Sequence, residues 1–417
     1  MKRYSPDRHF LAHFVIVSLS TCLLIVSINL IVDPYSLNGW IEKSGFNYIK
    51  PAFRGNQWIA KVFEVSRKRP SVIFLGTSRA AHGLDPLHPA LAGKITYNLA
   101  TDGAQIAEIK ELFEHSVNTS KIDIAIIGLD LVSFSNNTGN IKLRHDLMDI
   151  GGRQRSDSRQ LEIFRASLSI ETLWDSYQTV QSQQTPSEFT HDGQRTDEYY
   201  ANFINEYGGV RAACEGYMKE ISHNRKKITT VENQNASFQW DDIQSMLKLA
   251  KQQNIELYFF ISPTHAWDLE YLRAWGEWNR FLNWKRDLVK VIDDQTPQEQ
   301  DTKQAKVVLW DFSGYNSITT ENIPASTVAH TNMQYFWEFS HYRTLVGGWI
   351  LERVLGVKQS QSQIPDDFGV KLTQNNIEAQ ITDIELAREK YVQQNAQDVA
   401  FINNIVQSTI HSLPTEN

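Results

Sequence analysis

One long and mainly apolar run without acidic or basic residues other than His13, residues 10–32, dominates the hydrophobic pattern near the N-terminus. A helix of this length covers roughly 30–35 Å, which is enough to cross a lipid bilayer. Basic residues precede the run and Asp33 is the first charge after it, so the basic side is expected to stay in the cytoplasm. The pattern predicts a cytoplasmic segment at residues 1–9, a single transmembrane anchor at residues 10–32, and a main domain on the periplasmic or extracellular side of the cytoplasmic membrane. A cleaved signal peptide is the alternative, but the run is long for one and no small-x-small site closes it.

After the anchor, short and mainly apolar runs alternate with stretches of helical periodicity. Five runs have the length and composition of buried strands: residues 72–75, 95–99, 122–127, 255–261 and 307–310. Four stretches have the pattern of helices: residues 104–115, 241–252, 275–292 and 341–355. This alternation predicts an α/β fold with a parallel sheet between two layers of helices. In such sheets functional residues gather at the carboxyl ends of the strands.

Three segments do not follow the alternation. Residues 33–69 are expected to form a stalk between the anchor and an α/β domain at residues 70–356. Within that domain, residues 136–231 are polar and rich in Gln and Ser, and they are predicted to form an inserted cap over the strand ends. The C-terminal tail, residues 357–417, is predicted to begin with a polar linker and to continue as a helix with one apolar stripe.

Composition narrows the classes of partner. The 417 residues carry a net charge of −7 with both signs interspersed, which argues against a nucleic-acid partner because such proteins have a basic footprint. Eleven Trp and fifteen Tyr are generous for this length. Such rings often line sugar-binding grooves, but they are more often ordinary core residues. The two cysteines are not expected to pair, because Cys22 lies within the apolar run and Cys214 stands alone.

The first candidate for chemistry is Ser78, in the segment Gly76-Thr77-Ser78 that follows the predicted strand 72–75. A serine between a strand end and a helix start presents its hydroxyl beside backbone N–H groups that can stabilise an oxyanion. Serine is a weak nucleophile and needs a base within hydrogen-bond reach. The alternative is that Ser78 merely caps the helix.

The candidate base comes late in the chain, in the segment Glu338-Phe339-Ser340-His341. From three residues before His341, Glu338 can accept a hydrogen bond from one ring nitrogen while the other nitrogen faces Ser78. Such a pairing fixes the tautomer of the histidine and lets it take the serine proton. The alternative is that both side chains serve only as caps at the start of a helix.

Together these two segments resemble the SGNH, or GDSL-like, serine hydrolase superfamily. The Gly-Thr-Ser turn at Ser78 is similar to its first motif, and Glu338-x-x-His341 is similar to its last, with Glu in place of Asp. By the order of elements the resemblance covers about residues 70–355. It implies a flavodoxin-like, three-layer sandwich and a catalytic triad of Ser78, His341 and Glu338.

The resemblance also implies an oxyanion hole. Its donors are expected to be the backbone N–H groups of Ser78 and Gly103, the latter in a segment similar to the second motif. The third motif supplies an asparagine in the family, whereas this chain has Asp130, and an anionic carboxylate cannot donate. Either Asn98 or Asn136 therefore takes that place, or activity is reduced.

Two further details narrow the resemblance. A single anchor followed by Asp-Pro, and the block Trp-Glu-x-Ser-His-Tyr, are similar to features of membrane-anchored SGNH-like proteins in bacterial alginate-acetylation and teichoic-acid D-alanylation systems. Such proteins move acyl groups onto or off envelope polymers, often beside a multi-span membrane acyltransferase. The resemblance implies a polysaccharide or acylated glycan as substrate, the lipid bilayer as the partner of residues 10–32, and such an acyltransferase as a second partner.

Four polar residues are expected at the same rim of the sheet and are predicted to contact substrate: Arg79, Asp130, His265 and Asp311. His265 follows the strand 255–261, and it is either an alternative base, a substrate contact or a hydrogen-bonded loop residue. Metal ligation is a rival use for His265, Asp311 and His341, but no metal-ligand spacing supports it. The sequence therefore predicts no metal and no cofactor.

The leading hypothesis is a serine-dependent O-acyl esterase or O-acyltransferase acting on cell-envelope or exported polysaccharide. One alternative is a catalytically inactive SGNH-like scaffold that binds polysaccharide or an acyltransferase, which the presence of Asp130 favours. A weaker alternative is a glycan-processing enzyme with paired carboxylates. Its only candidates are Glu338 with Asp311 or Asp130.

Overall fold

The computed structural model describes residues 6–135, 143–226, 238, 240–295, 306–325, 332–358 and 363–412. The ends of the predicted insertion, Asn136 and the outermost residues of both termini lie outside this part of the chain. Two compact units are interleaved in sequence: Met1–Lys68 with Lys142–Phe189, and Arg69–Ile141 with Thr190–Asn417. We call the first the helical unit and the second the sheet unit. The segment predicted as one insertion is thus divided between the two units.

The sheet unit contains one six-stranded sheet in the order β2-β1-β3-β4-β5-β6. The strands are β1 (Val72–Leu75), β2 (Thr96–Asn98), β3 (Ile124–Leu129), β4 (Glu256–Ile261), β5 (Val307–Asp311) and β6 (Val370–Leu372). The five predicted strands are all present and parallel, so the α/β class is confirmed. The prediction of a wholly parallel sheet is wrong at one edge, where β6 runs antiparallel to β5. A strand of three residues is too short to show a hydrophobic period in the sequence.

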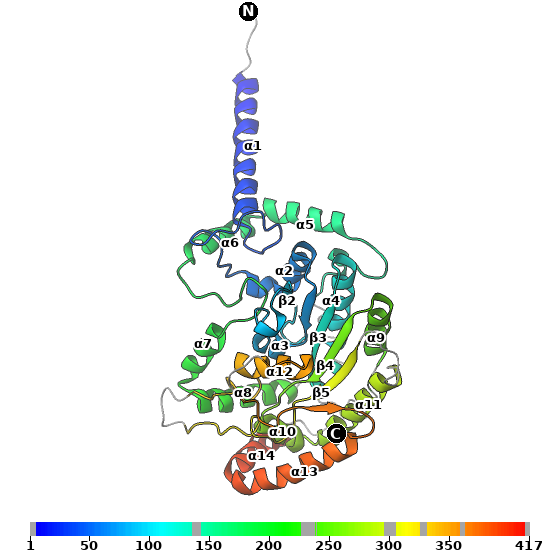
Figure 1. Cartoon of the computed structure of the whole chain (residues 1–417). Coiled ribbons are helices and arrows are strands. Elements are labelled where there is room, and N and C mark those ends of the chain that lie inside the picture. The colour runs from blue at the N-terminus through cyan, green and yellow to red at the C-terminus, as the bar shows by residue number, and fades with distance from the viewer. Residues whose placement is uncertain are drawn as a thin grey trace, which may run out of the picture. The chain divides into compact units, whose positions relative to one another are not determined.

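Helices cover both faces of this sheet (Figure 1). α3 (Ser78–Gly83) follows β1, and α4 (Ile106–Thr119) follows β2. The chain steps from β1 to β2 in one direction and from β2 back across β1 to β3 in the other. Right-handed crossovers therefore place α3 and α4 on opposite faces. α9 (Asp241–Gln253) and α11 (Trp278–Gln295) extend the α4 layer, whereas α12 (Thr344–Leu355) packs on α3.

The remaining helices of the sheet unit come from segments with a weaker pattern. They are α7 (Glu198–Tyr207), α8 (Val210–Lys226), α10 (Ala266–Ala274), α13 (Ile377–Gln394) and α14 (Ala396–His411), with short 3-10 helices η1 (Pro89–Leu91) and η2 (Leu131–Phe134). α14 packs against α8 and α10, and α13 packs against α11. The apolar stripe predicted in the tail is confirmed in α13, which buries Ile377, Ile381, Ile384 and Tyr391.

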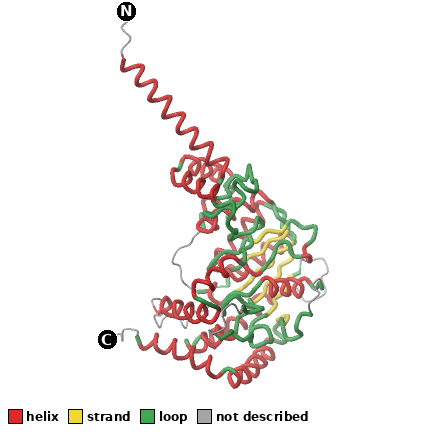
Figure 2. Tube along the Cα trace, turned by 90° about the vertical axis from the view of Figure 1, so that its left-hand side faces the viewer, coloured by secondary structure: helices red, strands yellow, loops and turns green. Residues whose placement is uncertain are grey.

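The helical unit contains α1 (Pro6–Val32), α2 (Phe53–Lys68), η3 (His145–Leu147), α5 (Ser156–Leu168) and α6 (Ile170–Gln181). Most of α1 is exposed, and its stretch Arg8–Val32 is long and apolar enough to cross a membrane. α5 and α6 both pack against α1 (Figure 2). The predicted stalk and the first part of the predicted insertion therefore form one unit with the predicted anchor.

Candidate active site

The turn that carries Ser78 begins where β1 ends. All four side chains of β1 are buried, as expected of a central strand in a parallel sheet. Gly76 follows with a φ of +141°, and a Cβ at this position would lie 2.9 Å from the carbonyl oxygen of Gly128. Only glycine fits there. Thr77 is the N-cap of α3, since its hydroxyl accepts a hydrogen bond from the Arg79 N–H at 3.3 Å. The capping alternative for Ser78 is therefore wrong, and its hydroxyl is left for another contact.

Ser78, His341 and Glu338 form a continuous chain of hydrogen bonds. Ser78 Oγ lies 2.8 Å from His341 Nε2, and His341 Nδ1 is hydrogen bonded to Glu338 Oε1. With the Nδ1–H donating to the carboxylate, the Nε2 lone pair faces the serine hydroxyl. His341 is 8% exposed and Glu338 is 1% exposed, whereas Ser78 is half-buried. This is the arrangement that activates a serine nucleophile.

Glu338 is held in place by the backbone of its own turn. Its carboxylate accepts hydrogen bonds from the N–H groups of Ser340 at 2.7 Å and His341 at 3.0 Å. The helix that was predicted to start near residue 341 begins at Thr344 as α12, and an antiparallel bridge joins Phe336 to Tyr342. Both members of the pair thus lie on a tight loop, which fixes the carboxylate relative to the imidazole.

Asp130 organises the two residues on either side of Ser78. It follows β3, and its carboxylate accepts hydrogen bonds from Thr77 Oγ1 at 2.6 Å and from the Arg79 guanidinium at 3.1 Å. Arg79 also donates to Asp268 at 2.6 Å. Burial lowers the pKa of Arg79, but Asp130 and Asp268 outweigh it and raise that pKa above its ordinary value. Arg79 and Asp130 therefore bind each other, and their contact with substrate stays a prediction.

Asp268 is a member of this network that the sequence did not single out. It lies on α10, three residues after His265, and burial raises the pKa of its carboxyl while Arg79 opposes the shift. Asp268 could have been recognised from its position in the first turn of the helix after β4, at the carboxyl end of the sheet.

The backbone N–H groups of Ser78 and Gly103 are the predicted donors of an oxyanion hole. Within the described part of the chain, the N–H groups of Ser78 and Gly103 make no hydrogen bond. The Thr101 N–H donates to the Gly76 carbonyl at 3.1 Å, which ties the segment of Gly103 to the nucleophile turn. Gly103 has a φ of +65°, which favours glycine.

Asn98 does not have the geometry of an oxyanion donor. Its amide group donates to the carbonyl oxygens of Ala80 at 3.0 Å and Leu84 at 2.9 Å, and its Oδ1 accepts from the Ala100 N–H. Both amide protons are thus engaged by the last turn of α3. The predicted oxyanion role does not fit, and Asn98 instead joins β2 to α3.

Aromatic side chains from α7 and α8 enclose one side of the triad. The Tyr200 ring lies 4.8 Å from the His341 ring and stacks at 6.0 Å on Trp337. Tyr217 lies 5.4 Å from Phe339, and burial raises the pKa of both tyrosines. The two tyrosines were not among the predicted site residues, although the aromatic residues in 199–207 recur at helical spacing. This part of the predicted insertion contacts the candidate site.

His82, at the end of α3, is a second buried imidazole near the triad. It is completely buried and lies edge-on to Tyr200 at 4.8 Å. Burial, with a smaller contribution from the neighbouring His341, lowers the pKa of His82 to about 3. The imidazole is therefore neutral at ordinary pH, and it adds no charge behind the candidate base.

His265 and Asp311 are structural in this fold. His265 caps α10 by accepting from the Trp267 N–H at 3.1 Å, and its Nε2 lies 2.8 Å from the Glu321 carbonyl. Burial lowers the pKa of His265 to about 4. Asp311 is 1% exposed and pairs with the equally buried Lys285 at 2.7 Å. The predicted substrate contacts do not fit these two residues, because their polar atoms already have partners.

The described residues contain no cluster of three or more His, Cys, Asp or Glu side chains suited to a metal ion. A scan against protein-family models found no match, and no curated protein matches the sequence. Evidence for function therefore comes from the geometry around Ser78.

Proposed function

We propose that this chain is a serine-dependent O-acyl esterase or O-acyltransferase that acts on cell-envelope or exported polysaccharide. In this proposal α1 anchors it in the cytoplasmic membrane, with the main domain on the periplasmic or extracellular side. The observation that carries the proposal is the hydrogen-bonded chain from Ser78 through His341 to Glu338.

The proposed reaction proceeds through an acyl-enzyme. Ser78 Oγ attacks the acyl carbonyl carbon while His341 Nε2 takes the hydroxyl proton, and Glu338 stabilises the resulting imidazolium. The N–H groups of Ser78 and Gly103 bind the oxyanion. The ester bond to the sugar oxygen breaks, His341 returns the proton to that oxygen, and the acyl group remains on Ser78. Water as the second acceptor makes the enzyme an esterase, and a sugar hydroxyl makes it a transferase.

The topology supports membership of the SGNH superfamily. The five parallel strands have the order 2-1-3-4-5, which is that of flavodoxin-like folds. The Gly-Thr-Ser turn follows the first strand, and the Glu-x-x-His segment precedes α12, as that resemblance requires. Asp130 departs from the pattern, and its contacts to Thr77 and Arg79 give it the role of positioning the nucleophile turn.

The choice of a glycan substrate follows from the narrower resemblance to alginate-acetylation and D-alanylation proteins. The aromatic side chains beside the triad are compatible with it, because sugar rings stack on such faces. A multi-span membrane acyltransferase as donor of the acyl group belongs to the same proposal.

The second candidate function is a catalytically inactive scaffold that binds polysaccharide or an acyltransferase. Asp130 favours it, since this position holds no neutral amide to complete an oxyanion hole. The half-buried Ser78, hydrogen bonded to an imidazole, favours the enzyme.

Covalent labelling of the full-length chain in detergent with a fluorophosphonate probe separates the two. The native chain should be labelled on Ser78, and Ser78→Ala should abolish the signal. His341→Ala should abolish it too, whereas His265→Ala is the matched control and should label at the native rate per folded molecule. A folded native chain that fails to react, or a Ser78→Ala variant that still reacts, would contradict the enzyme.

Incubation with an acetylated polysaccharide then tests the substrate class. Mass spectrometry of the peptide that contains Ser78 should find an acetyl group on that residue in the native chain. If the chain reacts with the probe but never with acylated glycans, the serine enzyme stands and the proposed substrate is wrong.

A further inference from the structure

The helical unit has large apolar side chains on surfaces that its own packing leaves open. Six of them recur at helical spacing and are 47–77% exposed: Leu161, Phe164 and Leu168 in α5, and Ile170, Trp174 and Tyr177 in α6. We call these six residues the outer face. The exposed charged residues Arg165 and Glu171 adjoin them in sequence.

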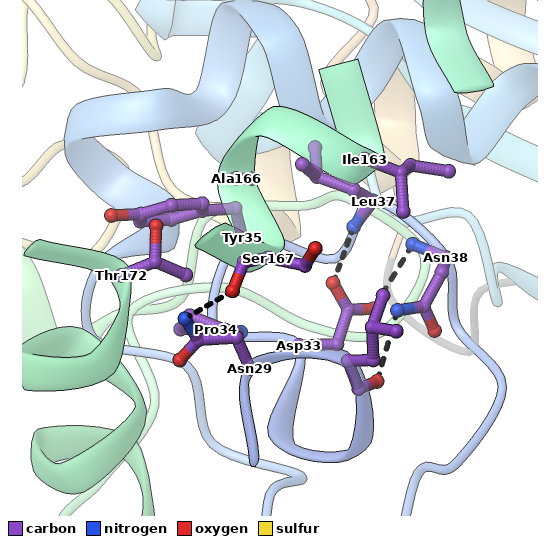
Figure 3. A pocket seen from close by; sticks show the side chains of 11 residues that line it. Asn29, Asp33, Pro34, Tyr35, Leu37, Asn38, Ile163, Ala166, Ser167 and Thr172 are labelled. Carbon is purple, nitrogen blue, oxygen red and sulfur yellow. Dashed lines mark hydrogen bonds between the residues drawn. The ribbon is translucent and has the colours of Figure 1, made fainter. Parts of the chain in front are cut away.

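The opposite sides of the same two helices are small and polar. The buried Asn29 of α1 donates to the carbonyl oxygens of Ser167 at 2.9 Å and Ser169 at 3.0 Å (Figure 3). Ser176 Oγ in turn donates to Asn29 Oδ1 at 3.0 Å. A helix on the surface of a water-soluble domain has the reverse pattern, with apolar residues inside and polar residues outside. The inversion indicates that the surroundings of the outer face are themselves apolar.

The inner side has no room for the outer-face residues. The cavity between α1 and α5 has a volume of about 10 Å³, which holds no more than one water molecule. Its lining includes Asn29, Asp33 and Ser167, whose polar atoms are hydrogen bonded to neighbouring backbone (Figure 3). Large apolar side chains such as Phe164 therefore cannot turn inward without breaking these contacts.

The inner side of α5 packs against the end of the apolar helix α1. Ile163, Ala166 and Ser167 of α5 border the segment 33–38 that leaves α1. At 100° per residue, Leu161, Phe164 and Leu168 lie on the other side of α5 and face away from that segment. Figure 1 shows α5 lying across the end of α1 rather than along it.

We propose that the outer face of α5 and α6 lies in the headgroup region of the same bilayer that α1 spans. This proposal rests on the membrane anchoring included in the proposed function, but on no part of the chemistry. Amphipathic helices of this kind lie in the plane of the membrane with their apolar side about 5–10 Å below the headgroup boundary. Trp174 and Tyr177 suit that depth, because indole and phenol rings favour the membrane–water interface.

A lipid surface fits the outer face better than a protein partner does. The six residues extend over two helices that meet at the single residue Ser169, directly beside the last turns of α1. A helix that crosses a bilayer brings this junction to the membrane surface.

The test uses the full-length chain in vesicles of phosphatidylcholine and phosphatidylglycerol. The exposed Cys22 is replaced by Ser, and the buried Cys214 is kept. Single cysteines are introduced as Phe164→Cys and Trp174→Cys, with Leu386→Cys of α13 as the matched control, since Leu386 is apolar and 53% exposed. Each is labelled with an environment-sensitive nitrobenzoxadiazole dye, and its quenching by nitroxide lipids and by aqueous iodide is measured.

At the two outer-face positions we expect blue-shifted emission, strong quenching by nitroxide lipids and protection from iodide, with the opposite result at position 386. Outer-face labels that behave like the control would overturn the proposal. Labels that are exposed in vesicles but protected in native membranes would also overturn it, in favour of a protein partner. Extraction of the chain by alkaline carbonate would refute the anchoring itself, whereas labelling of Ser78 reports separately on the proposed chemistry.

Discussion

Replacing Asp130 by Asn distinguishes two roles for this residue. In the first, the carboxylate of Asp130 positions the turn that carries Ser78. In the second, Asp130 only replaces the asparagine that would donate to the oxyanion, and the replacement weakens catalysis. Asp130 accepts from Thr77 at 2.6 Å and from Arg79 at 3.1 Å, and these two residues flank Ser78. An Asn keeps one acceptor oxygen but sets its NH₂ group against the second donor. One of the two contacts is therefore lost.

The size of the effect follows from burial and from what Arg79 retains. A hydrogen bond to a charged group contributes about 1.5–3 kcal/mol, and Asp130 is only 4% exposed. Arg79 keeps its ion pair with Asp268 at 2.6 Å. The loss of stability is therefore smaller than that of a buried charge left without a partner, which is about 3–5 kcal/mol. We expect the free energy of unfolding to fall by about 2 kcal/mol. At about 2–4 °C per kcal/mol, Tm should fall by about 4–8 °C.

The assay combines thermal unfolding with the rate at which a fluorophosphonate labels Ser78 in the folded chain. We expect labelling of Asp130→Asn to slow about tenfold, equivalent to about 1.4 kcal/mol of lost positioning. Asp311→Asn is the matched control, because Asp311 is a buried carboxylate that pairs with Lys285. It should destabilise the chain and leave the labelling rate of the folded fraction unchanged. An Asp130→Asn variant with native Tm and equal or faster labelling would refute the positioning role.

Three other outcomes follow from the same geometry. Glu338→Gln should slow labelling of Ser78 by about 10²–10⁴-fold, because the imidazolium loses its counter-charge, and a native rate would exclude Glu338 from the mechanism. Asn98→Leu should lower the free energy of unfolding by at least about 2 kcal/mol, because it leaves buried carbonyl oxygens without a donor. An unchanged Tm together with lost labelling of Ser78 would instead support the oxyanion role of Asn98. Burial holds the pKa of His82 near 3 and that of His265 near 4, below the ordinary 6.5, so the unfolded chain binds more protons in acid. The stability from these neutral imidazoles is complete above pH 6.5 and should decrease by about 2.7 kcal/mol per pH unit between about pH 6 and pH 4. Denaturant titrations of His82→Phe should show about half that slope, and a native slope would contradict the shift in His82.

The sequence predicts the framework well because buried parallel strands are mainly apolar. The runs that became β1 and β4 stand out from polar surroundings, and helical periodicity identifies α9 to within one residue. The pairing of Ser78 with His341 was predicted from the base that a serine nucleophile requires and from the resemblance to SGNH hydrolases. Neither inference needs knowledge of long-range contacts.

The sequence predicts less well what each rim residue does. His265 and Asp311 follow strands as predicted, but their partners, the Glu321 carbonyl and Lys285, come from distant segments with no local signal. Asn98 likewise bonds to α3, which no local pattern indicates. Polar atoms at a strand end become available for chemistry only when the fold leaves them without partners, and that depends on tertiary packing.

The interleaving of the two units has a consequence for biogenesis. Residues 69–141, with β1 to β3, are synthesised between the two halves of the helical unit, so that unit stays unfinished until residue 189 has been made. Asn29 cannot form its hydrogen bonds with Ser167 and Ser176 until those residues, more than a hundred positions downstream, have been made. A secreted version that lacks α1 would therefore leave the polar groups that bind Asn29 without their partner. We expect such a version to fold poorly and to be cleaved readily by proteases.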